Sequence, residues 1–72
     1  MTYREIANDM HRRIDDGEFA PGAALPRYSA LARRYGVSVS TGQRAIMLLR
    51  DRGLVVGVPG RGVYVRERQG ES

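Results

Sequence analysis

The apolar residues near the start of the chain recur with the period of an amphipathic helix. One stripe contains Tyr3, Ile6, Ala7, Met10 and Ile14. Thr2 and Glu5 have the spacing of a capping box, which satisfies two backbone N–H groups at a helix start. Gly17 suits the left-handed backbone that ends many helices. The pattern therefore predicts a first helix from about Tyr3 to Asp16.

Proline and glycine residues delimit a second, shorter helix. Pro26 holds the residue before it out of the helical region, and Gly36 provides a stop. We therefore predict a helix from Tyr28 to Tyr35. Its N-cap is Arg27, which lacks the side-chain oxygen of a good N-cap residue. Its inward face carries Leu31, Ala32 and Tyr35.

A third helix is predicted between Ser38, a good N-cap, and Gly53, a good C-terminal stop. Its inner face carries Gly42, Ala45, Ile46 and Leu49. Its outward positions are Val39, Ser40, Gln43, Arg44, Met47 and Arg50. A glycine inside a helix costs about 1 kcal/mol relative to alanine. We therefore expect a neighbouring helix to approach closely at Gly42.

The last third of the chain changes to the pattern of β-strands. Residues 54–58 and 63–65 are rich in valine, and residues 59–62, Pro-Gly-Arg-Gly, separate them as a loop. We predict a β-hairpin here, followed by a polar tail or the start of a linker over residues 67–72. The predicted fold is a small α+β domain over residues 1–66. It is a winged helix-turn-helix, in which three helices precede a β-hairpin wing.

The connection between the second and third predicted helices is the sharpest local feature. Gly36, between Tyr35 and Val37, allows two helices to cross at about 90–120° through a turn of 3–4 residues. The second helix of such a pair can enter the major groove of DNA, which is about 12 Å wide. Small and polar residues at its start, before Gln43 and Arg44, suit contact with base edges.

Size and composition exclude several classes of function. The chain has 72 residues and no cysteine, so it forms one small domain without disulfides or thiolate metal ligands. It offers no nucleophile–base pair and no metal-ligand set, and its one histidine, His11, is expected at the surface; we expect no enzyme, cofactor or metal site. Because no apolar run reaches the roughly 18 residues of a membrane span and no signal peptide is evident, we expect a soluble cytoplasmic protein.

The charge is unevenly distributed along the chain. Residues 1–24 carry three Arg and five acidic residues, a net charge of −2, whereas residues 25–72 carry nine Arg and three acidic residues, a net charge of +6. A field concentrated in one part of a small domain indicates a polyanionic partner. A solvated basic surface in a chain that uses Arg in place of Lys explains the same composition, so charge alone does not decide.

A longer series of residues has a counterpart in a known family. The series is Tyr3, Ile6-Ala7, Ile14, Gly17, Pro21-Gly22, Leu25-Pro26, Leu31-Ala32, Gly36-Val37-Ser38, Thr41, Ala45, Leu49, Gly53-Leu54, Gly60-Arg61-Gly62 and Val65. In order and spacing the series resembles the N-terminal DNA-binding domain of GntR-family transcription regulators. Matching the two patterns requires no insertion or deletion. The resemblance implies a bacterial repressor, or less often an activator, that binds a palindromic operator in double-stranded DNA as a homodimer.

The resemblance also implies the placement of the DNA-binding elements. The recognition helix would be residues 38–52, in the major groove, and the wing residues 54–65, on the adjacent backbone or minor groove. In the family, a further C-terminal domain binds a small-molecule effector. The sequence leaves open whether this chain is a fragment of a longer regulator or a complete minimal protein.

The chain departs from the family pattern at positions that commonly contact DNA. Where the family usually has Ser-Glu-Arg, residues 27–29 are Arg-Tyr-Ser. The usual early arginine of the recognition helix is Val39 here, and a frequent later arginine is Gln43. Arg27 and Arg44 lie nearby as replacements. A known operator sequence is therefore not transferable to this chain.

The first group of candidate DNA-binding residues lies on the third helix. Gln43 could pair with adenine and Arg44 with guanine, each through two hydrogen bonds. Val39, Ser40 and Thr41 belong to the same expected specificity region, where the two hydroxyls could donate to phosphate or contact a thymine methyl group. For Thr41 a capping or packing role explains the residue equally well.

The second group would hold the DNA backbone. Arg27, Tyr28 and Arg33 surround the second helix and could bind phosphates. Arg33 and Arg34 point about 100° apart on a helix, so we expect only one of them to face DNA. Arg61, with Gly62 beside it, lies at the wing tip, where it could reach phosphates or a minor groove; an ordinary hairpin turn explains the glycines but not the arginine.

A different class of function remains open on the sequence alone. A winged helix can also serve as a protein–protein interaction module without specific DNA recognition, with its basic face incidental. Salt-dependent binding to duplex DNA distinguishes the two functions.

Overall fold

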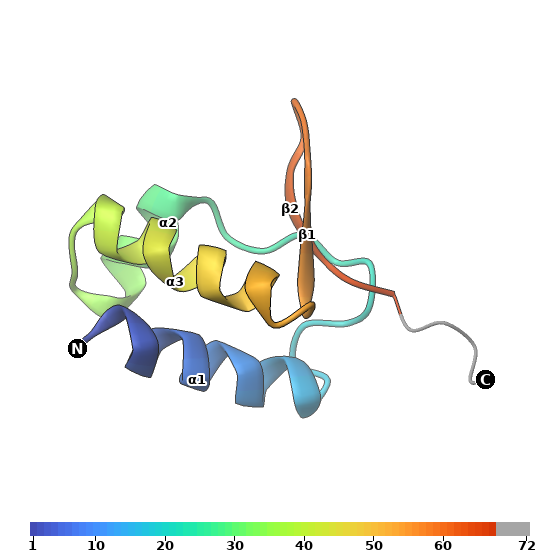
Figure 1. The fold of residues 1–72 in the computed structure, drawn as a ribbon, viewed down its shortest axis with the longest axis horizontal. Coiled ribbons are helices and arrows are strands. Elements are labelled where there is room, and N and C mark those ends of the chain that lie inside the picture. The colour runs from blue at the N-terminus through green and yellow to red at the C-terminus, as the bar shows by residue number, and fades with distance from the viewer. Residues whose placement is uncertain (68–72) are drawn as a thin grey trace.

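The fold follows the predicted order of three helices and a hairpin (Figure 1). The computed structural model describes residues 1–67. The elements are α1 (Tyr3–Asp15), α2 (Tyr28–Tyr35), α3 (Val39–Asp51), β1 (Val55–Val58) and β2 (Gly62–Val65). The predicted fold class is confirmed. The first helix ends one residue earlier than predicted, the recognition helix predicted over residues 38–52 is one residue shorter at each end, the first strand begins one residue later and the second strand one residue earlier. The tail predicted over residues 67–72 lies, except for its first residue, outside the described residues.

The helix ends are set by the predicted caps. The Glu5 N–H donates to Thr2 Oγ1 at 3.1 Å and the Thr2 N–H donates to Glu5 Oε1 at 2.8 Å, which completes the capping box of α1. At α3 the Ser38 hydroxyl oxygen accepts from the Thr41 N–H at 3.2 Å. Arg27 makes no side-chain cap at α2, as its chemistry predicts. α2 ends at Gly36, whose φ of 67° is left-handed.

The core is formed where α3 packs against both α1 and α2. Its largest fully buried side chains are Ile6, Met10, Leu31, Ile46 and Leu49. All four predicted inner positions of α3 are buried. At Gly42, an added Cβ would stand 3.3 Å from the Tyr28 carbonyl oxygen, tighter than ordinary packing. The close helix approach predicted from this glycine is therefore confirmed.

The wing is held at its base by a third segment that the sequence pattern did not predict. β1 and β2 pair antiparallel, with Val55 opposite Val65. The free edge of β2 pairs with the connection between α1 and α2 through an isolated bridge from Ala24 to Tyr64. The supporting backbone bonds run from the Gly22 N–H to the Val65 oxygen at 2.9 Å, from the Val65 N–H to the Ala23 oxygen at 2.8 Å, and from the Leu25 N–H to the Val63 oxygen at 2.8 Å.

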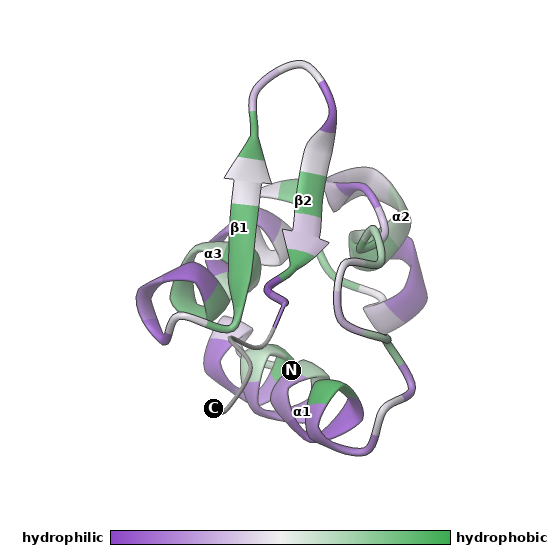
Figure 2. Cartoon of the chain, turned by 90° about the vertical axis from the view of Figure 1, so that its right-hand side faces the viewer, coloured by the Kyte–Doolittle hydropathy of each residue, from purple (hydrophilic) through white to green (hydrophobic). Residues whose placement is uncertain are grey.

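The hairpin therefore projects from the helical part with its base fixed and its turn farthest from α1 (Figure 2). Residues 59–61 form that turn, closed by a bond from the Arg61 N–H to the Val58 oxygen at 2.9 Å. In residues 1–67 no helix combines the length and the apolar character needed to cross a membrane.

Candidate nucleic-acid interface

The outward face of α3 presents the side chains that the helical period assigned to it. All six predicted outward positions are exposed, and half of the Val39 and Met47 surface is accessible. At the start of the helix the Ser38 hydroxyl lies 3.2 Å from Ser40 Oγ and 2.9 Å from Thr41 Oγ1. Thr41 is half-buried and joined to the cap through both its N–H and its hydroxyl. Gln43 and Arg44 lie on the exposed side beyond this cap.

Arg44 has an aromatic neighbour that the sequence analysis missed. Its guanidinium carbon lies 5.4 Å from the centre of the Tyr3 ring, within the roughly 6 Å range of cation–π attraction. The contact joins the first turn of α1 to the outward face of α3. The residues are far apart in the sequence, so no local pattern could have indicated it.

An open cleft of about 800 Å³ separates the wing from the start of α2. Three arginines from separate parts of the chain line it: Arg27 at the N-cap of α2, Arg50 in α3 and Arg61 in the turn of the wing. Tyr28 is half-buried at the same cleft, and Gly62 lines its wing side. The structure therefore brings Arg27 and Tyr28, at the start of α2, together with the wing, whereas Arg33 lies outside the cleft.

Arg50 was predicted to be outward but was not among the candidate DNA-binding residues. A Cβ added to Gly57 would stand 3.2 Å from the guanidinium carbon of Arg50, so this side chain lies directly against β1. A glycine inside a strand often marks close approach of another group. That signal, together with an outward arginine on the preceding helix, could have identified the contact.

Arg33 and Arg34, in the last turn of α2, are both exposed and do not line the cleft. The sequence expectation that only one of them faces DNA stays a prediction.

Ion pairing concentrates on α1. Within residues 1–67, every carboxylate that lies within 4 Å of a basic group pairs with a residue of α1: Arg12 and Arg13 with Asp9, Arg13 with Glu18, and His11 with Asp15. No such partner accompanies the arginines of α2, of the outward face of α3 or of the wing tip in that range. Their positive charge is therefore uncompensated by neighbouring carboxylates.

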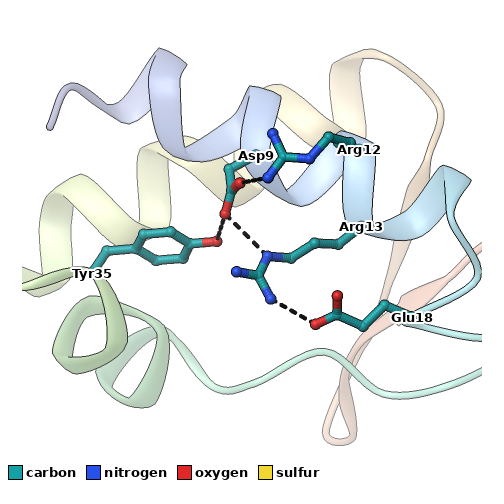
Figure 3. A network of polar contacts seen from close by, with 5 residues as sticks. All are labelled: Asp9, Arg12, Arg13, Glu18 and Tyr35. Atoms are coloured by element: carbon teal, nitrogen blue, oxygen red, sulfur yellow. Dashed lines mark hydrogen bonds and ion pairs between the residues drawn. The ribbon is translucent and has the colours of Figure 1, made fainter.

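A polar network ties α1 to the end of α2 (Figure 3). The Tyr35 hydroxyl donates to Asp9 Oδ2 at 2.6 Å, and Arg13 Nε donates to the same oxygen at 3.0 Å. Arg12 also binds Asp9, and Arg13 reaches Glu18 at 2.6 Å. The Tyr35 hydrogen bond is the main cause that lowers the pKa of Asp9, with Arg13 adding to it. Burial, followed by the hydrogen bond to Asp9, raises the pKa of Tyr35 to about 12.

We predict that Tyr35→Phe lowers the free energy of unfolding at neutral pH by about 1 kcal/mol, the net value of a typical hydrogen bond. The raised Tyr35 pKa means that its contribution is full below the unfolded-state pKa of about 10 and is lost as pH rises through about 12. Urea unfolding across pH 7–12 measures both effects. Tyr64→Phe is the matched control, since in residues 1–67 its hydroxyl forms no hydrogen bond to another side chain. Equal losses in the two variants would contradict the role of the network.

The comparisons with known proteins agree on one family. The model for bacterial regulatory proteins of the gntR family matches residues 2–65. The mannosyl-D-glycerate transport/metabolism system repressor MngR of Escherichia coli (strain K12) is 39% identical over 67 residues, which are 93% of this chain and 28% of the repressor. The histidine utilization repressor of Klebsiella aerogenes is 31% identical over 70 residues, 97% of this chain and 29% of the repressor. The chain thus spans less than a third of either relative.

Solved structures lead to the same conclusion. A GntR family transcriptional regulator from Listeria monocytogenes superposes with a TM-score of 0.86 at 30% identity, over 92% of this chain and 58% of that one. The DNA-binding domain of AraR, solved in complex with operator ORR3, superposes with a TM-score of 0.81 at 30% identity, over 88% of this chain and 76% of that one. From its family match, its relatives and its fold, the chain belongs to the GntR family of bacterial regulatory proteins.

Proposed function

We propose that this domain binds double-stranded DNA with sequence preference and acts in transcriptional repression. The observation that carries the proposal is the gathering of Arg27, Arg50 and Arg61 around one cleft, without carboxylate partners among residues 1–67. A surface of this kind is the electrostatic feature expected of a phosphate-binding face. The two relatives named as repressors, and the AraR domain solved with its operator, support the same function.

In this proposal α3 lies in the major groove. Gln43 reads an adenine and Arg44 a guanine through paired hydrogen bonds. Val39 contacts base edges at the start of the helix, where an apolar group suits a thymine methyl. Ser40 donates a hydrogen bond to a phosphate. Thr41 helps to hold the start of α3 in place through its hydrogen bonds with the Ser38 cap.

The backbone is held on either side of α3. Arg27, at the N-cap of α2, binds phosphates together with Tyr28 and Arg33 of that helix, and Arg50 adds a cation to the lining of the cleft. Arg61, with Gly62 allowing close approach, reaches the adjacent backbone or minor groove from the wing. Two copies of the domain would bind the halves of a palindromic operator, about 10 base pairs apart or a multiple of that.

The test is the dependence of DNA affinity on salt concentration. Each neutralised phosphate contributes about −0.9 to the slope of log affinity against log salt, so roughly three to five contacts give a slope of about −3 to −4.5. Fluorescence anisotropy with a random duplex and with a duplex selected from a random pool measures the slope and the sequence preference together. A flat salt dependence would contradict DNA binding and favour a protein-interaction module. Equal affinity for the two duplexes would contradict sequence preference.

A further inference from the structure

We infer that Tyr3 is a positioning residue for sequence recognition, because its ring orients the guanidinium of Arg44 for hydrogen bonding to a guanine. The inference rests on the proposed DNA binding by α3. It assigns a part in specificity to the first turn of α1, an element outside the helix-turn-helix pair and the wing. The juxtaposition that carries it is the Arg44 guanidinium 5.4 Å from the centre of the Tyr3 ring.

The type of contact matters for what Arg44 can still bind. A carboxylate partner would occupy two N–H donors of the guanidinium edge, the same edge that pairs with guanine O6 and N7. An aromatic ring attracts the face of the guanidinium and leaves the donors at the edge available. Among residues 1–67 no carboxylate lies within 4 Å of Arg44. Tyr3 thus restrains the side chain without consuming its hydrogen-bonding capacity.

The ring is itself held in place by the local structure. Tyr3 is half-buried and packs against the hydrophobic core. It follows Thr2 directly, whose capping box with Glu5 fixes the first turn of α1. On the other side, Arg44 precedes the fully buried Ala45 and Ile46, which fix the orientation of α3. The backbone that carries Tyr3 and the backbone that carries Arg44 are therefore both held in place by capping or by the core.

The physical benefit is that the Arg44 side chain is partly ordered before DNA binds. A free arginine side chain loses rotamer freedom when it is immobilised in an interface, and this loss weakens binding. A side chain that already packs against an aromatic ring has less rotamer freedom to lose when it binds DNA. The effect is specific to the base pair that Arg44 contacts, whereas phosphate contacts elsewhere are unaffected.

The experiment compares Tyr3→Leu, which keeps an apolar side chain without a π face, with Tyr3→Phe, which keeps the ring. Affinities are measured for the selected operator and for operators altered at the base pair whose preference is lost in Arg44→Ala. An exposed cation–π contact is worth about 0.5–1 kcal/mol, so Tyr3→Leu should reduce the preference at that base pair about 2- to 5-fold. Tyr3→Phe should retain it. In the Arg44→Ala background, Tyr3→Leu should change the preference no further.

A purely structural contact would give a different result. If Tyr3→Leu lowers the melting temperature or weakens binding to all duplexes equally, with the preference at that base pair unchanged, the inference is wrong while the proposed function stands. If the unaltered protein fails to distinguish its selected operator from random duplex, the proposed function fails and the inference with it. Should Tyr3→Leu not fold, pentafluorophenylalanine at position 3 keeps the shape of the ring and reverses its electrostatic face; an unchanged preference in that protein would overturn the inference.

Discussion

Replacing Ile46 with alanine is expected to remove about 2–5 kcal/mol from the free energy of unfolding. Ile46 is fully buried on the inner side of α3, where that helix packs against α1 and α2. A core in a domain of this size rarely supplies more than about 3–5 kcal/mol. We therefore expect the variant to be largely unfolded at 37 °C. Urea unfolding followed by circular dichroism, without DNA, measures the loss.

The neighbouring residue provides the control for this experiment. Met47 is 52% exposed on the same helix, so Met47→Ala should change the free energy of unfolding by only about 0.5 kcal/mol. If the two variants lose equal stability, the orientation of α3 described above is wrong. Every proposed base contact would then need reassignment, because all of them depend on which side of α3 faces outward.

The second large effect separates base reading from backbone positioning. Gln43→Ala should cost about 1–3 kcal/mol on the selected operator and relax the preference at one base pair, because its paired hydrogen bonds to adenine are lost. Arg33→Ala should instead weaken binding to all duplexes and make the salt slope shallower by about one unit. Anisotropy titrations of each variant with the operator and with random duplex of equal length make the comparison.

Arg12→Ala is the matched control for the change in net charge. It removes one positive charge from α1, where Arg12 pairs with Asp9. The slope of log DNA affinity against log salt should therefore stay nearly unchanged. Equal losses of Gln43→Ala on operator and random duplex would show that α3 does not read bases in this orientation. An unaltered salt slope in Arg33→Ala would show that Arg33 does not contact a phosphate.

The sequence was sufficient to predict the helices because strong local signals mark their ends. Pro26 and Gly36 bracket α2, and its predicted bounds are those observed. Ser38 caps α3, and the period of its apolar residues identifies both of its faces. These features depend on residues within one or two turns of each other. Local physics therefore determines them.

Contacts between distant segments could not be predicted in the same way. Ala23 and Ala24 have no strand-forming character, yet they pair with β2 because its edge is free beside them. The contacts of Tyr35 with Asp9 and of Arg44 with Tyr3 arise only after α1 packs against its neighbours. For the candidate interface, the sequence identified the exposed positions of α3 correctly, whereas Tyr28 and Thr41 are half-buried and the partners that orient Arg44 and Arg50 came from the packing.

The pairing of residues 22–25 with β2 also bears on the order of folding. The two segments enclose α2, α3 and β1 along the chain, so their pairing closes a long loop. Closing a long loop costs chain entropy before its contacts can compensate, whereas the helices can form from local contacts. We therefore expect the base of the wing to be completed late, after α3 has docked. In the proposed binding mode, a chain that had formed its helices but not this closure would lack a fixed position for Arg61, so we expect full contact with DNA to need the completely folded domain.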